Sequence, residues 1–210
     1  MNELICESIG EAWISACEYI FDKGNAMKDE DKDIKELLHF ILKIKSPSEK
    51  DEIILKYGNK GMIDWMHSNF FEQKNVPELK NGLSYGHRLF NYDGKNQVEW
   101  VIEKLKKKPE AKSVTIPMLM PNKDSGYIPC VSMLDFKIRE GKLMIVAMCR
   151  SIDFGKKVYA NMLELHRVQK MVADKVGVPT GELLMYVVSA HIYADEYKQM
   201  RGIIEDVRNS

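Results

Sequence analysis

The clearest secondary-structure signal in this chain lies at residues 127–161, which read YIPCVSMLDFKIREGKLMIVAMCRSIDFGKKVYAN. In the segment CVSMLDFKI, alternate residues from Cys130 to Ile138 share one face of an extended chain, and LMIVAM is a short apolar run of strand length. The sequence Arg-Glu-Gly at residues 139–141 separates the two segments as a turn would. The stretch therefore predicts a β-hairpin.

Polar side chains that can perform chemistry flank this hairpin. Cys130 opens it, Arg150 follows the second predicted strand, and Asn161 lies further on. A thiol can act as a nucleophile, a guanidinium can bind phosphate through two parallel hydrogen bonds, and an amide offers both a donor and an acceptor. We expect these three groups to lie close to strand ends.

The composition is that of a globular chain without a strong electrostatic bias. With 210 residues the chain is long enough to close a core, and we expect a single domain over residues 1–210. Lysine plus arginine equals aspartate plus glutamate, at 31 each, so no overall field recruits nucleic acid or an anionic membrane. The first ten residues, MNELICESIG, are acidic rather than basic and apolar, and no apolar run approaches ~20 residues, which favours a cytoplasmic protein over a secreted or membrane protein.

The four cysteines are Cys6, Cys17, Cys130 and Cys149, and their spacing matches neither a metal site nor a disulfide framework. We therefore expect no bound metal. Cys6 and Cys17 fall within an apolar helical pattern, which favours small core residues, because free cysteine is among the most buried residue types.

Periodicity predicts the remaining elements. Apolar residues recur at helical spacing in six segments, namely residues 5–22, 34–44, 48–57, 97–107, 162–176 and 200–207. Two further segments have the apolar content and length of strands, namely residues 114–120 and 183–190. Residues 25–33, NAMKDEDKD, are predicted to form a polar loop.

Four separated motifs resemble those of the thymidylate synthase family, whose members methylate deoxyuridylate. They read Ile-Pro-Cys-Val at 128–131, Cys-Arg-Ser-Ile-Asp at 149–153, Tyr-Ala-Asn at 159–161 and Ser-Ala-His-Ile-Tyr at 189–193. Any one alone is weak, but their order and spacing make the likeness specific. The resemblance implies a three-layer α/β domain on a large mixed sheet, a pyrimidine nucleoside monophosphate as substrate, and a homodimer with two sheets back to back.

The resemblance also implies three catalytic residues. The Cys130 thiolate would add to carbon 6 of the pyrimidine. Glu36, in Glu-Leu-Leu-His-Phe at 36–40, would manage protons at the ring through water, because a carboxylate on an apolar segment acquires a useful protonation state when it is buried. Tyr85, in a Tyr-Gly motif, would assist proton removal from carbon 5. The alternative for Glu36 is a side chain that simply faces water beside Lys35.

A further set of residues is implied to hold the nucleotide. The phosphate would be bound by an arginine and a serine, the pyrimidine would be positioned by an aspartate and selected as uracil by an amide, and the sugar hydroxyl would be held by a histidine and a tyrosine. In chain order these are Arg150, Ser151, Asp153, Asn161, His191 and Tyr193. Deoxycytidylate hydroxymethylases resemble the family but place Asp at the position of Asn161. For each residue seen singly, ordinary turn or strand-end chemistry is the alternative.

Two assignments depend on looser matches. Lys112, in Pro-Glu-Ala-Lys-Ser at 109–113, stands where family arginines cross a dimer interface to the partner's phosphate site. A lysine supplies charge without the planar fork, so the phosphate would be bound more weakly or differently, and a surface loop lysine is the alternative. Trp65, in Ile-Asp-Trp, would line the pterin pocket, or else be a core or interface aromatic.

Departures from the family pattern leave the one-carbon donor and the reaction open. Val131 replaces the usual His after the nucleophile, and the chain ends soon after Tyr193, where familiar members continue with a tail over the folate. The implied cofactor is methylene-tetrahydrofolate or methylene-tetrahydromethanopterin. Three functions follow: methylation of deoxyuridylate, hydroxymethylation of cytidylate or deoxycytidylate (CMP or dCMP), or nucleotide binding without catalysis.

Overall fold

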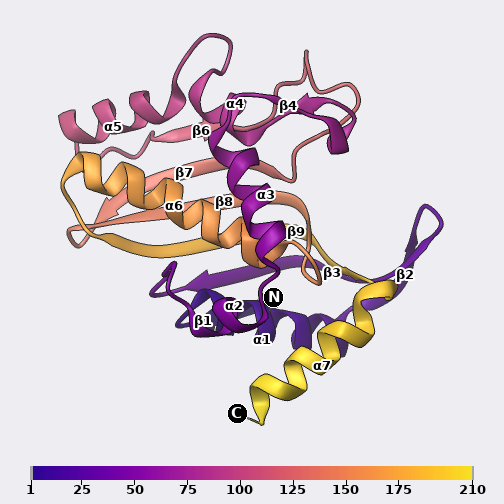
Figure 1. The fold of residues 1–210 in the computed structure, drawn as a ribbon. Helices are drawn as coiled ribbons and strands as arrows, with labels where there is room; N and C mark the ends of the chain where they lie inside the picture. Colours follow the sequence, from indigo (N-terminus) through magenta and orange to yellow (C-terminus); the bar gives the residue numbers. More distant parts are fainter. Residues whose placement is uncertain (1, 210) are drawn as a thin grey trace.

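The computed structural model describes residues 2–209, and a seven-stranded mixed sheet runs through it (Figure 1). The strand order is β1-β3-β9-β8-β7-β6, with β2 and β1 sharing one edge of β3. The strands are β1 (Asn2–Cys6), β2 (Asn25–Asp29), β3 (Lys32–Ile44), β6 (Thr115–Pro117), β7 (Val131–Arg139), β8 (Lys142–Asp153) and β9 (Thr180–Tyr193). The pairs β1/β3 and β8/β9 are parallel and the others antiparallel, which confirms the predicted mixed sheet.

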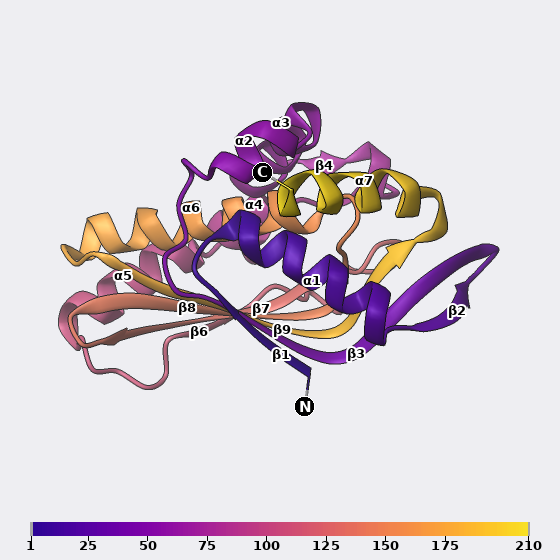
Figure 2. The same ribbon diagram turned by 90° about the horizontal axis from the view of Figure 1, so that it is seen from below.

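The helices lie on one face of this sheet (Figure 2). They are α1 (Ile9–Lys23), α2 (Glu52–Tyr57), α3 (Lys60–Phe71), α4 (Tyr85–Phe90), α5 (Gln97–Lys107), α6 (Val158–Val176) and α7 (Tyr197–Arg208), with short 3₁₀ turns η1 (Pro77–Leu79) and η2 (Ala194–Glu196) and a small hairpin of β4 (Asn75–Val76) and β5 (Gly82–Leu83). Helices α1 and α6 pack on the sheet, while α2, α3 and α7 pack on those two helices. The sheet and two tiers of helices make three layers.

The central hairpin is confirmed. β7 and β8 pair antiparallel, with Arg139 opposite Lys142, so the loop holds only Glu140 and Gly141. Both loop residues have positive φ, 51° and 72°, as a type I′ turn requires. β8 is longer than predicted and runs to Asp153, so Arg150 and Ser151 lie within the strand rather than after it.

The prediction of a helix over residues 34–44 is wrong, because this segment is the strand β3. The buried residues Leu37 and Phe40 are three apart, which imitates a helical period. The cause is His39, whose φ of 55° marks an irregularity that resets the alternation. Beyond it, Phe40, Leu42 and Ile44 are buried at strand spacing. Pairing with β9 along almost its whole length overrides the helix propensity of its Leu, Lys and Glu residues.

The boundaries of other elements differ from the predicted ones where backbone hydrogen bonding, and not the pattern of apolar side chains, decides the secondary structure. Residues 25–29 are exposed yet form β2 instead of a loop, because a strand edge supplies hydrogen bonds whatever the side chains are. The first helix begins only at Ile9, capped by Ser8, so Cys6 is a buried residue of β1 and not of the helix. The prediction of α5 over residues 97–107 is confirmed, whereas only Thr115–Pro117 of the predicted strand 114–120 is paired in β6.

The far face of the central strands β3, β8 and β9 has no covering helix within residues 2–209 (Figure 2). Apolar side chains lie on it in adjacent rows: Val146 pairs with Leu184, and Met148 pairs with Tyr186. Val146, Leu184 and Tyr186 are half-buried, and Met148 is exposed at 38%. None of the helices described in residues 2–209 is long and apolar enough to span a lipid bilayer.

Candidate active site

A pocket of about 460 Å³ lies where β3 begins and β8 and β9 end, beside the start of α6. Its volume falls within the range of about 300–1,000 Å³ that is common for small-molecule sites. Most of the residues predicted to act line it: Glu36, Cys130, Arg150, Ser151, Asp153, Asn161, His191 and Tyr193. Segments separated by more than a hundred residues are thus brought together.

The sheet register explains why three of these side chains meet. Glu36 on β3 pairs with His191 on β9, and His191 pairs in turn with Asp153 on β8. Neighbouring strands lie about 4.8 Å apart, so residues at one register level form a row across the sheet. A carboxylate, an imidazole and a second carboxylate therefore stand side by side along one wall of the pocket.

Cys130 lies immediately before β7 and is only partly buried. Its segment is fixed to β8 by Arg150, whose backbone N–H donates to the Cys130 carbonyl (2.9 Å). The Arg150 guanidinium donates to the carbonyls of Ile128 (2.6 Å) and Pro129 (3.2 Å) and to the Ser151 hydroxyl (3.1 Å). One arginine therefore holds the thiol-bearing segment at the pocket.

Two tyrosines lie beside this thiol. Tyr85, the first residue of α4, is buried, and its hydroxyl accepts a hydrogen bond from the Val131 backbone N–H (3.0 Å). The Tyr127 side chain lies beside Cys130 and interacts with its thiol. Burial raises the pKa of Tyr85 and of Tyr127 well above the ordinary value, with Cys130 as a further cause for both. Sequence reasoning did not identify Tyr127, although its position three residues before Cys130 was a signal.

Glu36 is held on a strand, not on the predicted helix. Its carboxylate accepts a hydrogen bond from the Ser189 hydroxyl of β9 (2.5 Å). Lys35, in contrast, donates to the Phe21 carbonyl (2.5 Å). The side chain of Glu36 lines the pocket, and Ser189 is a second pocket residue that the sequence reasoning missed.

His191 is buried in the pocket wall, and its Nδ1 has no hydrogen-bond partner within residues 2–209. Burial lowers the pKa of His191, while the Asp153 carboxylate opposes that shift. The neutral imidazole is therefore favoured, with one ring nitrogen free for a ligand. Tyr193 stands edge-on to this ring, and its hydroxyl donates to Asp29 of β2 (2.7 Å). Asp29 was assigned to a loop by the sequence.

Asn161 lies in the first turn of α6 and is 4% exposed. Its Nδ2 donates to the Lys157 carbonyl (3.0 Å), which fixes the orientation of the amide. Asp153, at the end of β8, accepts a hydrogen bond from the Lys156 backbone N–H (3.1 Å). The turn between β8 and α6 thus presents an amide and a carboxylate to the same pocket.

A second pocket of about 260 Å³ adjoins this turn. Its aromatic lining comes from Trp13, Tyr57 and Tyr159, and Gly155 and Glu196 also line it. Burial, and next the Asp153 carboxylate, raise the pKa of Glu196 to about 8. Glu196 was not identified from the sequence, where it is one acidic residue in a polar segment.

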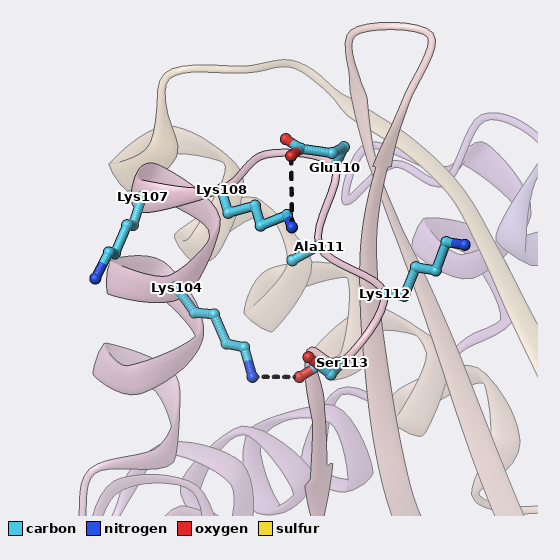
Figure 3. Close-up of a pocket in the computed structure, with 7 residues that line it drawn as sticks. All are labelled: Lys104, Lys107, Lys108, Glu110, Ala111, Lys112 and Ser113. Carbon is cyan, nitrogen blue, oxygen red and sulfur yellow. Dashed lines mark hydrogen bonds and ion pairs between the residues drawn. The ribbon is translucent and has the colours of Figure 1, made fainter.

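Two predicted residues lie elsewhere. Trp65 of α3 is partly buried against the core and lines neither pocket. Lys112 lines a separate surface hollow after α5, where its side chain extends away from Lys104 and Lys108 (Figure 3). There Lys104 donates to the Ser113 carbonyl (2.7 Å). Among the described residues, no group of three or more His, Cys, Asp or Glu is arranged to hold a metal ion.

Comparison with known proteins matches the sequence to one family. A family model described as thymidylate synthase matches residues 15–209. A protein of Methanosarcina mazei is 29% identical over 205 residues, covering 96% of this chain and 94% of its own. One of Methanothermobacter marburgensis is 27% identical over 219 residues (97% and 98%), and one of Methanocaldococcus jannaschii is 30% identical over 202 residues (90% and 89%). All three carry the name "Putative thymidylate synthase".

Proposed function

This chain belongs to the thymidylate synthase family, and from that premise we propose that it methylates deoxyuridylate at carbon 5 with a one-carbon unit from a reduced pterin. The observation that carries the proposal is the meeting of Cys130, Arg150 and Asn161 around one pocket. These are a nucleophile, a cation for phosphate and an amide for uracil. They come from three different elements, so the proposal does not depend on a single motif.

Carbon 5 of uracil is a poor nucleophile until the ring is activated. The Cys130 thiolate would form a bond from Sγ to carbon 6, and the electrons of the 5,6 double bond would move onto the ring carbonyl as an enolate. Carbon 5 could then bond to the one-carbon unit and lose its proton. Once that unit has separated from its donor and taken up a hydride, expulsion of Sγ from carbon 6 would restore the 5,6 double bond. The buried Tyr85 hydroxyl, held beside Cys130 at the Val131 N–H, is the proposed aid to that proton loss.

The phosphate is assigned to Arg150 and Ser151. A guanidinium has five N–H groups, and hydrogen bonds to Ile128, Pro129 and Ser151 use three of them. The remaining N–H groups can bind phosphate oxygens while the others hold the thiol segment. Binding of the phosphate and placement of Cys130 would therefore depend on the same side chain.

The base and sugar are assigned to the opposite wall. Asn161 can donate to a uracil carbonyl or accept from its ring N–H, and its amide is oriented by Lys157. The unpartnered Nδ1 of His191 supports a role toward the sugar hydroxyl, because a buried polar atom without a partner is costly unless a ligand completes it. Tyr193 would assist, and Glu36 with Ser189 would manage protons at the ring.

Exchanging Asn161 for Asp tests this assignment. A carboxylate cannot donate to a carbonyl, so we expect kcat/KM for deoxyuridylate to fall by about 10- to 100-fold, the range for one buried polar group left unpaired. The variant should turn over deoxycytidylate relatively better. Tritium release from carbon 5 of each nucleotide measures the ratio. Asn96→Asp, at the N-cap of α5 where either residue caps a helix, is the matched control. An unchanged ratio would remove Asn161 from base selection.

The second pocket fits a pterin ring. The rings of Trp13, Tyr57 and Tyr159 can pack on its faces. The partly buried Glu196 carboxyl, whose Oε2 receives no hydrogen bond from the described residues, can accept from the N–H groups of the pterin. At about 260 Å³ this pocket would hold the ring system and leave the tail outside. When bound, the group supplies the one-carbon unit and the hydride that reduces it to a methyl group. Folate and methanopterin donors share such a ring, so the assay must include both.

The direct test is incubation of the protein with deoxyuridylate, ribouridylate and both cytidylates, each labelled with tritium at carbon 5, with and without each reduced pterin. We expect tritium release from deoxyuridylate only, dependent on a pterin, with thymidylate as product. Release from cytidylate with a hydroxymethyl product would replace methylation by hydroxymethylation. Nucleotide binding without any tritium release would indicate that the protein is a non-catalytic relative of the family.

We also propose that the chain forms a homodimer through the uncovered face of its sheet. The apolar rows that include Val146, Met148, Leu184 and Tyr186 would pack against their own copies, as a two-fold axis requires. In such a dimer Lys112 would approach the partner's phosphate site, which accounts for its distance from the pocket of its own chain.

Met148→Glu tests this face. It places one charge in the interface from each copy, so we expect the dimer dissociation constant to rise by roughly 100-fold or more, given the cost of burying unpaired charges. Sedimentation equilibrium measures that constant. Leu55→Glu, at a side chain 73% exposed on α2, is the control and should leave it unchanged. Equal effects of the two substitutions would place the interface elsewhere.

A further inference from the structure

The wall between the two pockets contains two carboxyl groups that face each other. Asp153 lines the larger pocket, and Glu196 lines the smaller one. Glu196 Oε2 is buried and receives no hydrogen bond from a donor among the described residues. Its polar neighbour is the Asp153 carboxyl, with which it can hydrogen-bond only when one of the two carries a proton.

Gly155, in the turn after β8, gives the Glu196 side chain room beside that turn. A Cβ atom at residue 155 would lie 2.2 Å from Glu196 Oε2 and 3.1 Å from Glu196 Cβ, so a larger residue would displace the carboxyl. The absence of a side chain at residue 155 therefore lets Glu196 approach the turn that carries Asp153.

The surroundings of the pair are mostly acidic or neutral. Apart from Asp153, the ionisable groups around Glu196 are Asp195 on η2, Cys17 on α1, Tyr159 on α6 and Tyr193 on β9. Lys156, which lines the same small pocket, is exposed. His191 is adjacent to Asp153 in the sheet and is held neutral by burial. Two carboxylates in such a site, one buried and one partly buried, repel each other unless they share a proton.

We propose that Asp153 and Glu196 share one proton at neutral pH, with Glu196 acting as the positioning residue that holds the Asp153 carboxyl between the nucleotide and the pterin. Burial and the Asp153 charge raise the pKa of Glu196 to about 8, in agreement with this pairing. Loss of the shared proton to solvent leaves two negative charges in contact and drives the pair apart. Its effect on turnover rests on the proposed function, whereas the existence of the pair does not.

The direction of the effect on stability follows from proton linkage. In the unfolded chain Glu196 titrates near the ordinary value of 4.5, and in the folded chain near 8. Between these pH values the native state binds the extra proton, so the stability present below pH 4.5 is lost progressively as the pH rises through 8. Gln cannot ionise but can donate to Asp153, so Glu196→Gln should remove this dependence.

The first experiment measures the melting temperature from pH 5 to 9 for the wild type, Glu196→Gln and the control Glu205→Gln, which removes the same charge at an exposed position of α7. We expect the wild type and the control to lose stability together as the pH rises. The Glu196→Gln substitution should flatten the curve by more than half and exceed the wild-type melting temperature at pH 9. A variant that is less stable at every pH, or parallel to the wild type, overturns the proposal.

The second experiment follows the side-chain carboxyl carbons by ¹³C NMR and, where the enzyme turns over, the pH profile of kcat/KM. One carboxyl signal should titrate with an apparent pKa near 8 and disappear in Glu196→Gln. The wild-type profile should fall above pH 8, and the Gln variant should lack this fall. Glu196→Ala should lose activity throughout the profile. If no turnover is found, the NMR titration alone tests whether Asp153 and Glu196 share a proton. The absence of a carboxyl signal that titrates near 8 would refute the pair.

Discussion

Cys130→Ala should abolish tritium release from carbon 5 of deoxyuridylate, with a loss of about 10⁴-fold or more, the scale seen when a covalent nucleophile is removed. Without Sγ no bond forms to carbon 6, and carbon 5 never gains the electron density that it needs. Nucleotide binding should change by less than about threefold, because Arg150, Asn161 and His191 keep their places. Steady-state release assays and calorimetric titration with deoxyuridylate measure the two quantities.

Cys6→Ala is the matched control, because it removes a free thiol that is buried in β1, away from the pocket. Its activity should stay close to that of the wild type. Residual activity in Cys130→Ala equal to that of the control would show that the reaction does not use this thiol. Loss of binding together with activity would instead point to collapse of the segment that Arg150 holds.

The largest effect on stability is expected at Arg88, a fully buried arginine of α4. Its guanidinium donates to both carboxylate oxygens of Asp124 (2.6 and 3.1 Å) and to the carbonyls of Leu83 and Met118 (3.2 and 2.7 Å). Arg88→Leu leaves the Asp124 charge buried without a partner, which should lower the free energy of unfolding by about 3–5 kcal/mol. Urea denaturation monitored by circular dichroism measures the loss.

A double substitution tests whether the Arg88–Asp124 ion pair is the source of this loss. Arg88→Leu combined with Asp124→Leu removes both charges, so it should recover part of the stability lost in the single variant. Lys123→Leu, in the same loop as Asp124, breaks an exposed ion pair with Asp93 and should cost less than about 1 kcal/mol. If Arg88→Leu cost no more than Lys123→Leu, the buried pair would not anchor the loop that leads to Cys130.

The sequence predicted the grouping of Cys130, Arg150 and Asn161 better than it predicted the strand that carries Glu36. Cys130, Arg150 and Asn161 lie in motifs whose spacing is independent of secondary structure, so their grouping could be anticipated. The strand β3 could not, because the irregularity at His39 disguises a period of two as a period of three to four. Pairing of β3 with β9 joins residues some 150 positions apart, and no local pattern reports such a contact.

The residues that could not be identified from the sequence are neighbours of the predicted site residues and not those residues themselves. Tyr127, Ser189 and Glu196 matter because the fold sets each beside a predicted residue, namely Cys130, Glu36 and Asp153. Each is an ordinary polar residue in its local sequence. Arg88 is likewise an ordinary residue in its local sequence, and its burial beside Asp124 supplies the reason for its presence.

Covalent attack by the Cys130 sulfur is the step on which the proposed reaction depends most. Mass spectrometry can test this attack directly. Deoxyuridylate with fluorine at carbon 5 cannot lose that substituent as a proton, so the adduct should persist after incubation with the protein and a reduced pterin. Peptide mapping should then place the added mass on the peptide that contains Cys130, and Cys130→Ala should show none. An unmodified Cys130 peptide in a protein that still turns over deoxyuridylate would contradict the account.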